Sequence, residues 1–326
     1  MSFNIVRCNI DKTKADAIVN IIYPGTRDMG FAPGYTSITP VDGIKQKYII
    51  NTYLPKDSGE ELIRKVYDKS LHLACDNHCG SIAFPLIPEK SDAQKGFSSE
   101  IAADVFTEFL KKYDIEIFLA LSETENIKLS EEVEEDINTL IYNTFPITPI
   151  STREYKIQHR NGMIPGLLGK IASGLAAFDK ESTFVSRKKM SVESDEAFEE
   201  GASMDSLDDA LKEIYTDSFE KHLQKLINKK GLKNSEVYAA ANISKQYFSK
   251  LLNGKVKPSK EKILALAVGL RLNLDETVDF LGIAGYALSP ISQTDLIVKY
   301  FISRKEYNVI KINIVLFEYG LEALTG

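Results

Sequence analysis

The sequence has few cysteines and no long apolar run. Cys8, Cys75 and Cys79 are an odd number in a chain of 326 residues, which argues against a disulfide framework and favours a reducing compartment. No apolar stretch approaches the roughly 20 residues of a membrane-spanning helix. The first residues, MSFNIVRCNIDK, have neither a basic region followed by an apolar run nor a small-residue cleavage site, so we predict a cytoplasmic protein without a membrane partner.

Length and charge indicate more than one domain. A chain of 326 residues exceeds the usual single domain of roughly 100–200 residues, and its 44% apolar content can fill real cores. The net charge is −6, but residues 218–290 carry twelve Lys or Arg against six Asp or Glu. That segment is therefore about +6 and the remainder about −12, so a basic surface is confined to one part of the chain.

Residues 2–121 alternate short apolar runs with helical patterns. Runs rich in Ile, Val and Phe predict strands at FNIVRC, DAIVNII, KYIINTYL, SIAFPLI and IEIFLAL. Apolar residues spaced three and four apart predict helices over 60–77 and 98–113, and a further helix is expected over 130–142. Strands that alternate with helices predict an α/β domain over residues 1–150.

Residues 151–210 differ in composition from the segments on either side. They include SRKKMSVESDEAFEEGASMDS, a polar run that cannot bury enough apolar surface to order itself, so we predict a flexible linker. A basic stretch followed by Ser191 and acidic residues also resembles a protein kinase substrate, and a phosphate there would change the local charge strongly. A solvated tether is the simpler interpretation.

Several segments of the first domain resemble the macro domain family in order and spacing. They are CNIDKTKADAIVNII, KQKYIINTYLP, YDKSLHLACDNHCGSIAFPLI and AADVFTEFLKKYDIEIFLAL. The resemblance covers roughly the first 120 to 145 residues and implies a three-layer α/β fold. Members of that family bind ADP-ribose, and some hydrolyse it from proteins or act on its derivatives.

The binding residues depart from that family. Where the family has an acidic residue that takes the adenine amine, this chain has Cys8, Asn9 and Ile10. Where the family has the sequence Asn-Ala-Ala-Asn, residues 20–23 of this chain are Asn-Ile-Ile-Tyr. The chain therefore lacks the asparagine that the family usually uses in catalysis, and the triple-glycine loop that follows it is not found. The second glycine loop, which cradles diphosphate through backbone amides, is replaced by the longer IPEKSDAQKGFSSE.

We therefore predict an altered ligand site rather than an enzyme, with no catalytic residue and no cofactor. A positioned base would be needed for hydrolysis, and the sequence nominates none clearly. The altered site would take a nucleotide-like ligand or a protein partner. The alternative is that the site binds ADP-ribose in the way that is usual for the family. The weak candidates for ligand contact are Ile10, Asn20, Lys95, Gly96 and Phe97.

A cluster of soft ligands lies within HLACDNHC. His72, Cys75 and Cys79 recur at helical spacing with His78 beside them, so three metal ligands could share one face. Structural zinc usually needs four ligands, and free cysteine commonly packs as a small hydrophobe. We therefore predict buried cysteines, a surface histidine and no metal site.

The basic segment carries a helix-turn-helix pattern. Apolar residues at 219, 223, 226 and 227 predict one face of a first helix, which Gly231 ends after two lysines. A second helix is expected from Asn234, and Ser244 is expected to cap a third, with Phe248, Leu251 and Leu252 inward. Further helices over 259–270 and 274–280 complete a five-helix bundle. Residues 211–290 thus resemble the lambda-repressor-like (XRE/Cro-type) family, an all-α fold.

That resemblance implies contacts with double-stranded DNA. In the family the third helix enters the major groove, where glutamine can read adenine and lysine guanine, while neighbouring groups grip phosphates. The residues that match these roles are Asn234, Ser244, Lys245, Gln246, Tyr247, Ser249, Lys250, Lys255 and Lys257. Such bundles also serve as protein-docking modules, because a fold alone does not fix function.

The remaining residues, 291–326, are strongly apolar and predict a helical extension that packs on the bundle or forms a homodimer interface. The complete pattern predicts a DNA-binding regulator whose altered macro domain senses a ligand or partner. Two rivals stay open: an enzyme or binding protein for ADP-ribose derivatives delivered by a docking bundle, and a phosphorylated adaptor.

Overall fold

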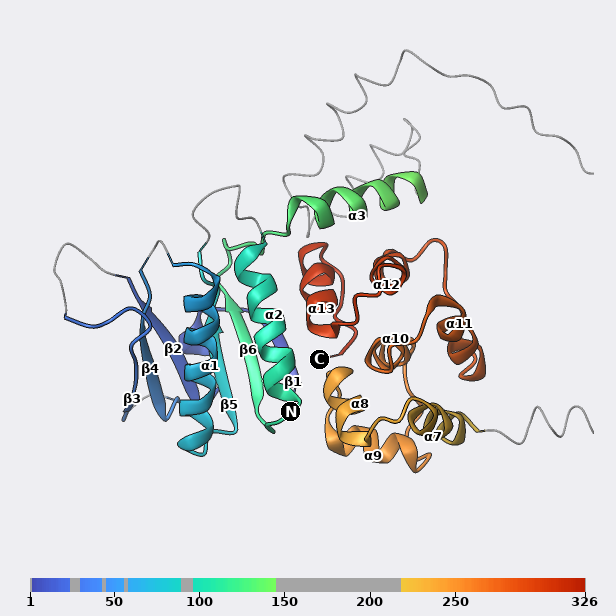
Figure 1. Ribbon diagram of the computed structural model, residues 1–326, viewed down its shortest axis with the longest axis horizontal. Helices are drawn as coiled ribbons and strands as arrows, with labels where there is room; N and C mark the ends of the chain where they lie inside the picture. Colours follow the sequence, from blue (N-terminus) through green and yellow to red (C-terminus); the bar gives the residue numbers. More distant parts are fainter. Residues whose placement is uncertain are drawn as a thin grey trace, which may run out of the picture. The chain divides into compact units, whose positions relative to one another are not determined.

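A six-stranded mixed sheet organises the N-terminal part of the computed structural model (Figure 1). The structure describes residues 2–23, 30–42, 45–55, 58–88, 96–144 and 218–325. The strand order is β1-β6-β5-β2-β4-β3, with β3 antiparallel to β4 and every other neighbouring pair parallel. The strands are β1 (Ser2–Arg7), β2 (Ala17–Ile22), β3 (Thr36–Pro40), β4 (Tyr48–Tyr53), β5 (Ser81–Pro85) and β6 (Glu116–Leu121).

Each apolar run that predicted a strand forms one, within one or two residues. Strand β3 lies in a stretch for which the sequence predicted no strand. Its segment TSITP ends in Pro40, lies at the edge of the sheet and is only partly buried. Its strand conformation depends on pairing with β4, for example Ile38 with Ile50, which a local pattern does not reveal.

Two helices cover one face of the sheet. Helices α1 (Glu60–Asp76) and α2 (Phe97–Leu110) lie side by side on that face (Figure 1). Alternate strand residues such as Ala17 and Val19 join this main core, while Ile18 between them packs in a smaller cluster on the other face, beside the short 3-10 helix η1 (Ile10–Lys12). Helix α3 (Glu131–Thr144) follows β6.

Helices are the only regular secondary structure among the described residues of the C-terminal part. The five helices of the expected bundle are α7 (Phe219–Lys229), α8 (Asn234–Ala240), α9 (Lys245–Leu252), α10 (Lys260–Gly269) and α11 (Leu274–Ile283). Gly231, at φ 66°, follows the end of α7 as expected for a glycine stop. Two further helices follow, α12 (Gln293–Ser303) and α13 (Val309–Glu318). The α/β and all-α classes expected for the two parts are confirmed.

The helical extension packs on the bundle and also on the sheet domain. Helices α12 and α13 contact α11 and α10 on one side, and α3, α2 and β1 on the other. Met1–Pro146 and Ser218–Gly326 accordingly form one compact unit. The expected linker at 151–210, with Ser191, lies outside the described residues. Among the residues that are described, no helix is both long and apolar enough to cross a membrane.

Candidate nucleic-acid interface

The helix-turn-helix motif is built from local capping and one left-handed residue. The Lys233 N–H donates to the Glu236 carboxylate over 2.7 Å at the start of α8. Asn242 in the turn has φ 51°, a conformation that asparagine tolerates better than most residues. Ser244 Oγ accepts a hydrogen bond from the Tyr247 N–H at 3.2 Å, so the cap expected for the third helix is confirmed.

Helix α9 separates an apolar face from a polar one. Phe248 and Leu251 are fully buried and Leu252 is partly buried, which holds the helix against the bundle. The opposite face exposes Lys245, Gln246, Ser249 and Lys250. The structure therefore brings these four predicted contact residues together on one accessible surface.

The remaining predicted contacts surround that surface. Tyr247 is half-buried under the ammonium of Lys262, which lies 5.0 Å from the ring centre, and burial raises the pKa of its phenol. Lys255 and Lys257 are exposed in the loop after α9, and Asn234 is exposed in the first turn of α8. Tyr247 and Ser244 are thus only partly exposed, whereas the lysines and Asn234 are open to a partner.

The candidate ligand site of the sheet domain retains one exposed asparagine. Asn20 stands near the C-terminal end of β2, and its amide donates to Asn51 Oδ1 over 2.9 Å on the parallel neighbour β4. Ile10 is partly buried and packs against the small cluster that contains Ile18. Lys95 lies outside the described residues. Their role in ligand contact stays a prediction.

Gly96 has a packing role that the sequence did not reveal. It has φ 80°, and a Cβ built on it would lie 2.3 Å from the Ser130 nitrogen. Phe97 begins α2 directly after it, and the Ser99 hydroxyl donates to the Lys128 carbonyl oxygen over 3.3 Å. The N-terminus of α2 is therefore held against the segment that leads into α3, because residue 96 has no side chain.

The soft-ligand cluster is spread over an ordinary helix and the turn after it. His72 is 44% exposed at its side chain and packs edge-on against Phe109 and Tyr113 of the α2 segment. Cys79 is buried and Cys75 half-buried, and burial raises the pKa of both thiols. The surface histidine and the buried Cys79 agree with the expected packing. Within the described ranges no group of His, Cys, Asp or Glu could hold a metal ion.

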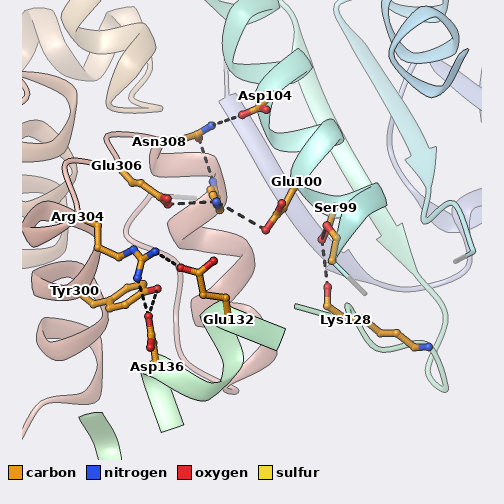
Figure 2. Close-up of polar contacts among 12 residues, drawn as sticks. Ser99, Glu100, Asp104, Lys128, Glu132, Asp136, Tyr300, Arg304, Glu306 and Asn308 are labelled. Atoms are coloured by element: carbon orange, nitrogen blue, oxygen red, sulfur yellow. Dashed lines mark hydrogen bonds and ion pairs between the residues drawn. The ribbon is translucent and has the colours of Figure 1, made fainter. Parts of the chain in front are cut away.

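Polar contacts join the sheet domain to the last two helices (Figure 2). Arg304, after α12, pairs with Glu132 and with Asp136 at 2.7 Å, and the Tyr300 hydroxyl donates to Asp136 over 3.1 Å. Asn308, before α13, accepts from the Thr107 hydroxyl at 3.0 Å. The sequence did not nominate these residues, because each reads as an ordinary surface polar side chain until its partner is known.

A second contact, which we call the polar junction, consists of Phe3, Asn242, Asn313 and Thr325. The Phe3 N–H donates to Asn242 Oδ1 over 2.7 Å, and Asn242 Nδ2 donates to the Phe3 carbonyl at 3.0 Å and to Thr325 Oγ1 at 2.9 Å. Asn313 Oδ1 accepts from the Leu324 N–H at 2.9 Å. All four junction residues are at most 4% exposed. The turn between α8 and α9 is thus bonded to the edge strand β1.

Comparison with known proteins confirms both resemblances. Residues 17–106 match the family model for the Macro domain, and residues 223–276 match that for the helix-turn-helix. A curated Macro domain-containing protein of Lactiplantibacillus plantarum is 40% identical over 63 residues. That match covers 18% of this chain and 37% of the relative, so the chain spans well under half of the relative's length.

Solved macro domains are also similar to the N-terminal part. That of ganglioside-induced differentiation-associated protein 2 is 18% identical, with a TM-score of 0.33, over 45% of this chain and 86% of its own. An Oceanobacillus iheyensis macrodomain with MES bound is 21% identical, with a TM-score of 0.31, over 37% and 83%. A Trypanosoma brucei macrodomain in complex with ADP is 20% identical, with a TM-score of 0.32, over 37% and 65%.

Proposed function

We propose that this chain, which joins a macro domain to a helix-turn-helix domain, is a cytoplasmic DNA-binding regulator of transcription. The observation that carries the proposal is the polar face of α9, which exposes Lys245, Gln246, Ser249 and Lys250 opposite its buried apolar residues. A helix of this kind fits the major groove, where glutamine pairs with adenine and lysine with guanine.

Neighbouring groups would hold the DNA backbone. Lys255 and Lys257 are exposed just beyond α9, and Asn234 is exposed at the start of α8, where polar side chains commonly contact phosphate. Ser244 uses its oxygen as the helix cap but keeps its hydroxyl proton for a phosphate oxygen. These phosphate contacts would fix the position of α9 along the duplex, but they would not distinguish one DNA sequence from another.

The macro domain would act as the sensor. Its helix α2 begins at the candidate ligand segment around Gly96. It contacts the α13 segment through Thr107 with Asn308 at 3.0 Å and through Glu100 with Lys311 at 3.8 Å. A ligand or partner that shifts the start of α2 would therefore act on a helix that also packs on the bundle. The site lacks the acidic adenine contact, so an altered nucleotide-like ligand or a protein is the expected effector.

The alternative is a protein that binds or hydrolyses ADP-ribose and uses the bundle to dock on another protein. The match of residues 17–106 to the Macro domain model favours it. Calorimetry with ADP-ribose separates the two, because heat of binding supports the alternative and its absence supports an altered sensor.

The deciding experiment is genome-wide recovery of DNA bound to the purified full-length protein. The test variant carries Lys245→Glu and Gln246→Ala, and the control carries Lys299→Glu and Gln293→Ala on α12. We expect enriched sites that the test variant loses and the control keeps. Absence of enrichment above a salt-sensitive background would reject DNA reading and leave the bundle as a protein-docking module.

A further inference from the structure

The polar junction places the sheet domain beside the DNA-facing end of α9. Asn242 is bonded to both backbone groups of Phe3, and the exposed face of α9 begins three residues later at Lys245. Because Asn242 and Phe3 are buried in this contact, the start of β1 is held next to the helix that we propose enters the major groove.

The turn between α2 and β6 lies at the same end of the sheet. Strand β6 pairs in parallel with β1, with Ile117 opposite Phe3, so the residues just before β6 lie close to the strand that Asn242 contacts. Helix α2 ends at Leu110 and packs beside α8 (Figure 1). A duplex seated on α9 would therefore pass close to residues 111–115.

Two adjacent lysines occupy this turn. Lys111 and Lys112 are both exposed, and the Lys112 N–H donates to the Phe109 carbonyl over 3.0 Å, which fixes the backbone that carries them. Among the described residues neither ammonium has a carboxylate partner. Of the nearby acids, Glu108 and Asp114 are exposed, and Glu116 accepts hydrogen bonds from Asn4 at 3.0 Å and Ser2 at 3.3 Å.

We propose that Lys111 and Lys112 of the macro domain contact the phosphate backbone of the DNA that flanks the groove occupied by α9. The proposal rests on the proposed DNA-binding function and extends its footprint from the bundle to the sheet domain. The major groove is only about 12 Å wide, so phosphates of both strands lie close to a helix within it. Flexible lysine ammonium groups are suited to such contacts, which add affinity but no sequence preference.

The test compares Lys111→Gln/Lys112→Gln with the control Lys45→Gln/Lys65→Gln in the full-length protein. Lys45 precedes β4 and Lys65 lies on α1, which packs on β3, β4 and β5, so the control removes the same charge toward the edge of the sheet opposite β1. Affinity for a recovered DNA site is measured across salt concentrations, together with hydroxyl-radical footprints.

For the test variant we expect the slope of log affinity against log salt to fall by about 1.8, from about 0.9 for each phosphate contact. Binding at roughly 0.1 M salt should weaken at least about tenfold, with unchanged sequence preference. The test variant should also lose protection of the DNA backbone from hydroxyl radicals on one side of the site that α9 occupies. The control variant should give the same slope and footprint as the unmodified protein.

Equal slopes and footprints for the test variant and the unmodified protein would overturn the proposal and leave the DNA-binding function intact. Equal losses in the test and control variants would also overturn it, because the effect would then come from net charge alone. If the unmodified protein binds no duplex specifically, both this proposal and the proposed function fail.

Discussion

At the scale of single residues, Glu318 is held close to neutrality by its surroundings. It lies at the end of α13, where burial raises the pKa of its carboxyl to about 7 despite a hydrogen bond from the Ile127 backbone and the nearby charge of Arg7. Glu134 raises the pKa further. The side chain is therefore protonated at mildly acidic pH in the folded protein, although it would be ionised in an unfolded chain.

We predict that Glu318→Gln stabilises the protein above neutral pH. Because the folded pKa is raised from 4.5, the contribution of Glu318 to stability is fully present below about pH 4.5 and is lost as pH rises through 7. Thermal unfolding of both proteins between pH 4.5 and 8 checks this. The curves should diverge as pH rises, and parallel curves would show that Glu318 is not held in this way.

The role of a single residue could be predicted from the sequence where its hydrogen-bond partner is only a few residues away. Ser244 was expected to cap α9 because a serine precedes a helical apolar pattern, and its bond to Tyr247 spans three residues. Asn242 is two positions earlier, yet its role was not foreseen. Its partner Phe3 is 239 residues away, and no spacing rule joins them.

At the scale of elements, the position of α2 depends on a glycine. Gly96 has a positive φ and lies against the backbone of Leu129 and Ser130, so any side chain would push the start of α2 away from the segment before α3. From the sequence we expected this glycine to be a weak candidate for ligand contact, within the segment that replaces the diphosphate loop. The structure gives it a packing reason that holds whether or not a ligand binds.

We predict that Gly96→Ala destabilises the protein clearly more than Gly30→Ala. Both glycines have positive φ, of 80° and 70°, but a Cβ at residue 30 meets nothing within 4 Å. The strain of a positive φ costs about 1 kcal/mol in each, and overlap should add roughly 1–3 kcal/mol at residue 96. Denaturant unfolding of the two variants measures the difference, and equal losses would refute the close contact.

Helices and strands could be predicted from the sequence where the apolar pattern of their own residues determines their conformation. The five parallel strands lie in runs rich in Ile and other apolar residues, and these runs mark their positions directly. Strand β3 was missed because its conformation comes from its neighbour β4. Helix α9 was found because Phe248 and Leu251 repeat at helical spacing.

At the scale of the whole molecule, the sequence suggested two domains on a tether, whereas the structure brings their described residues into one unit. Interfaces of this kind are hard to foresee because Arg304, Asp136 and Asn308 resemble any other surface residues. The exposed ion pairs contribute little stability, typically below about 1 kcal/mol each. The buried polar junction contributes more, because removing one partner leaves others unsatisfied.

We predict that Asn242→Gly loosens the sheet domain and the bundle together. Glycine accepts the positive φ but removes both bonds to the Phe3 backbone and the bond from Asn242 to Thr325, at a cost of about 2 kcal/mol. Hydrogen exchange should accelerate about thirtyfold in both β1 and the α8–α9 turn. The control Arg271→Gly, also at positive φ but exposed, should change neither, and acceleration in the turn alone would limit Asn242 to a local role.

The distance along the chain between Phe3 and Asn242 also has a consequence for synthesis. The open edge of β1 is finished first, but the turn that covers it is made 239 residues later. At ribosomal rates of about 5–20 residues per second, that edge waits for on the order of 12–48 seconds. During that interval the unpaired edge of β1 can pair with a strand of another nascent chain, which is a route to aggregation.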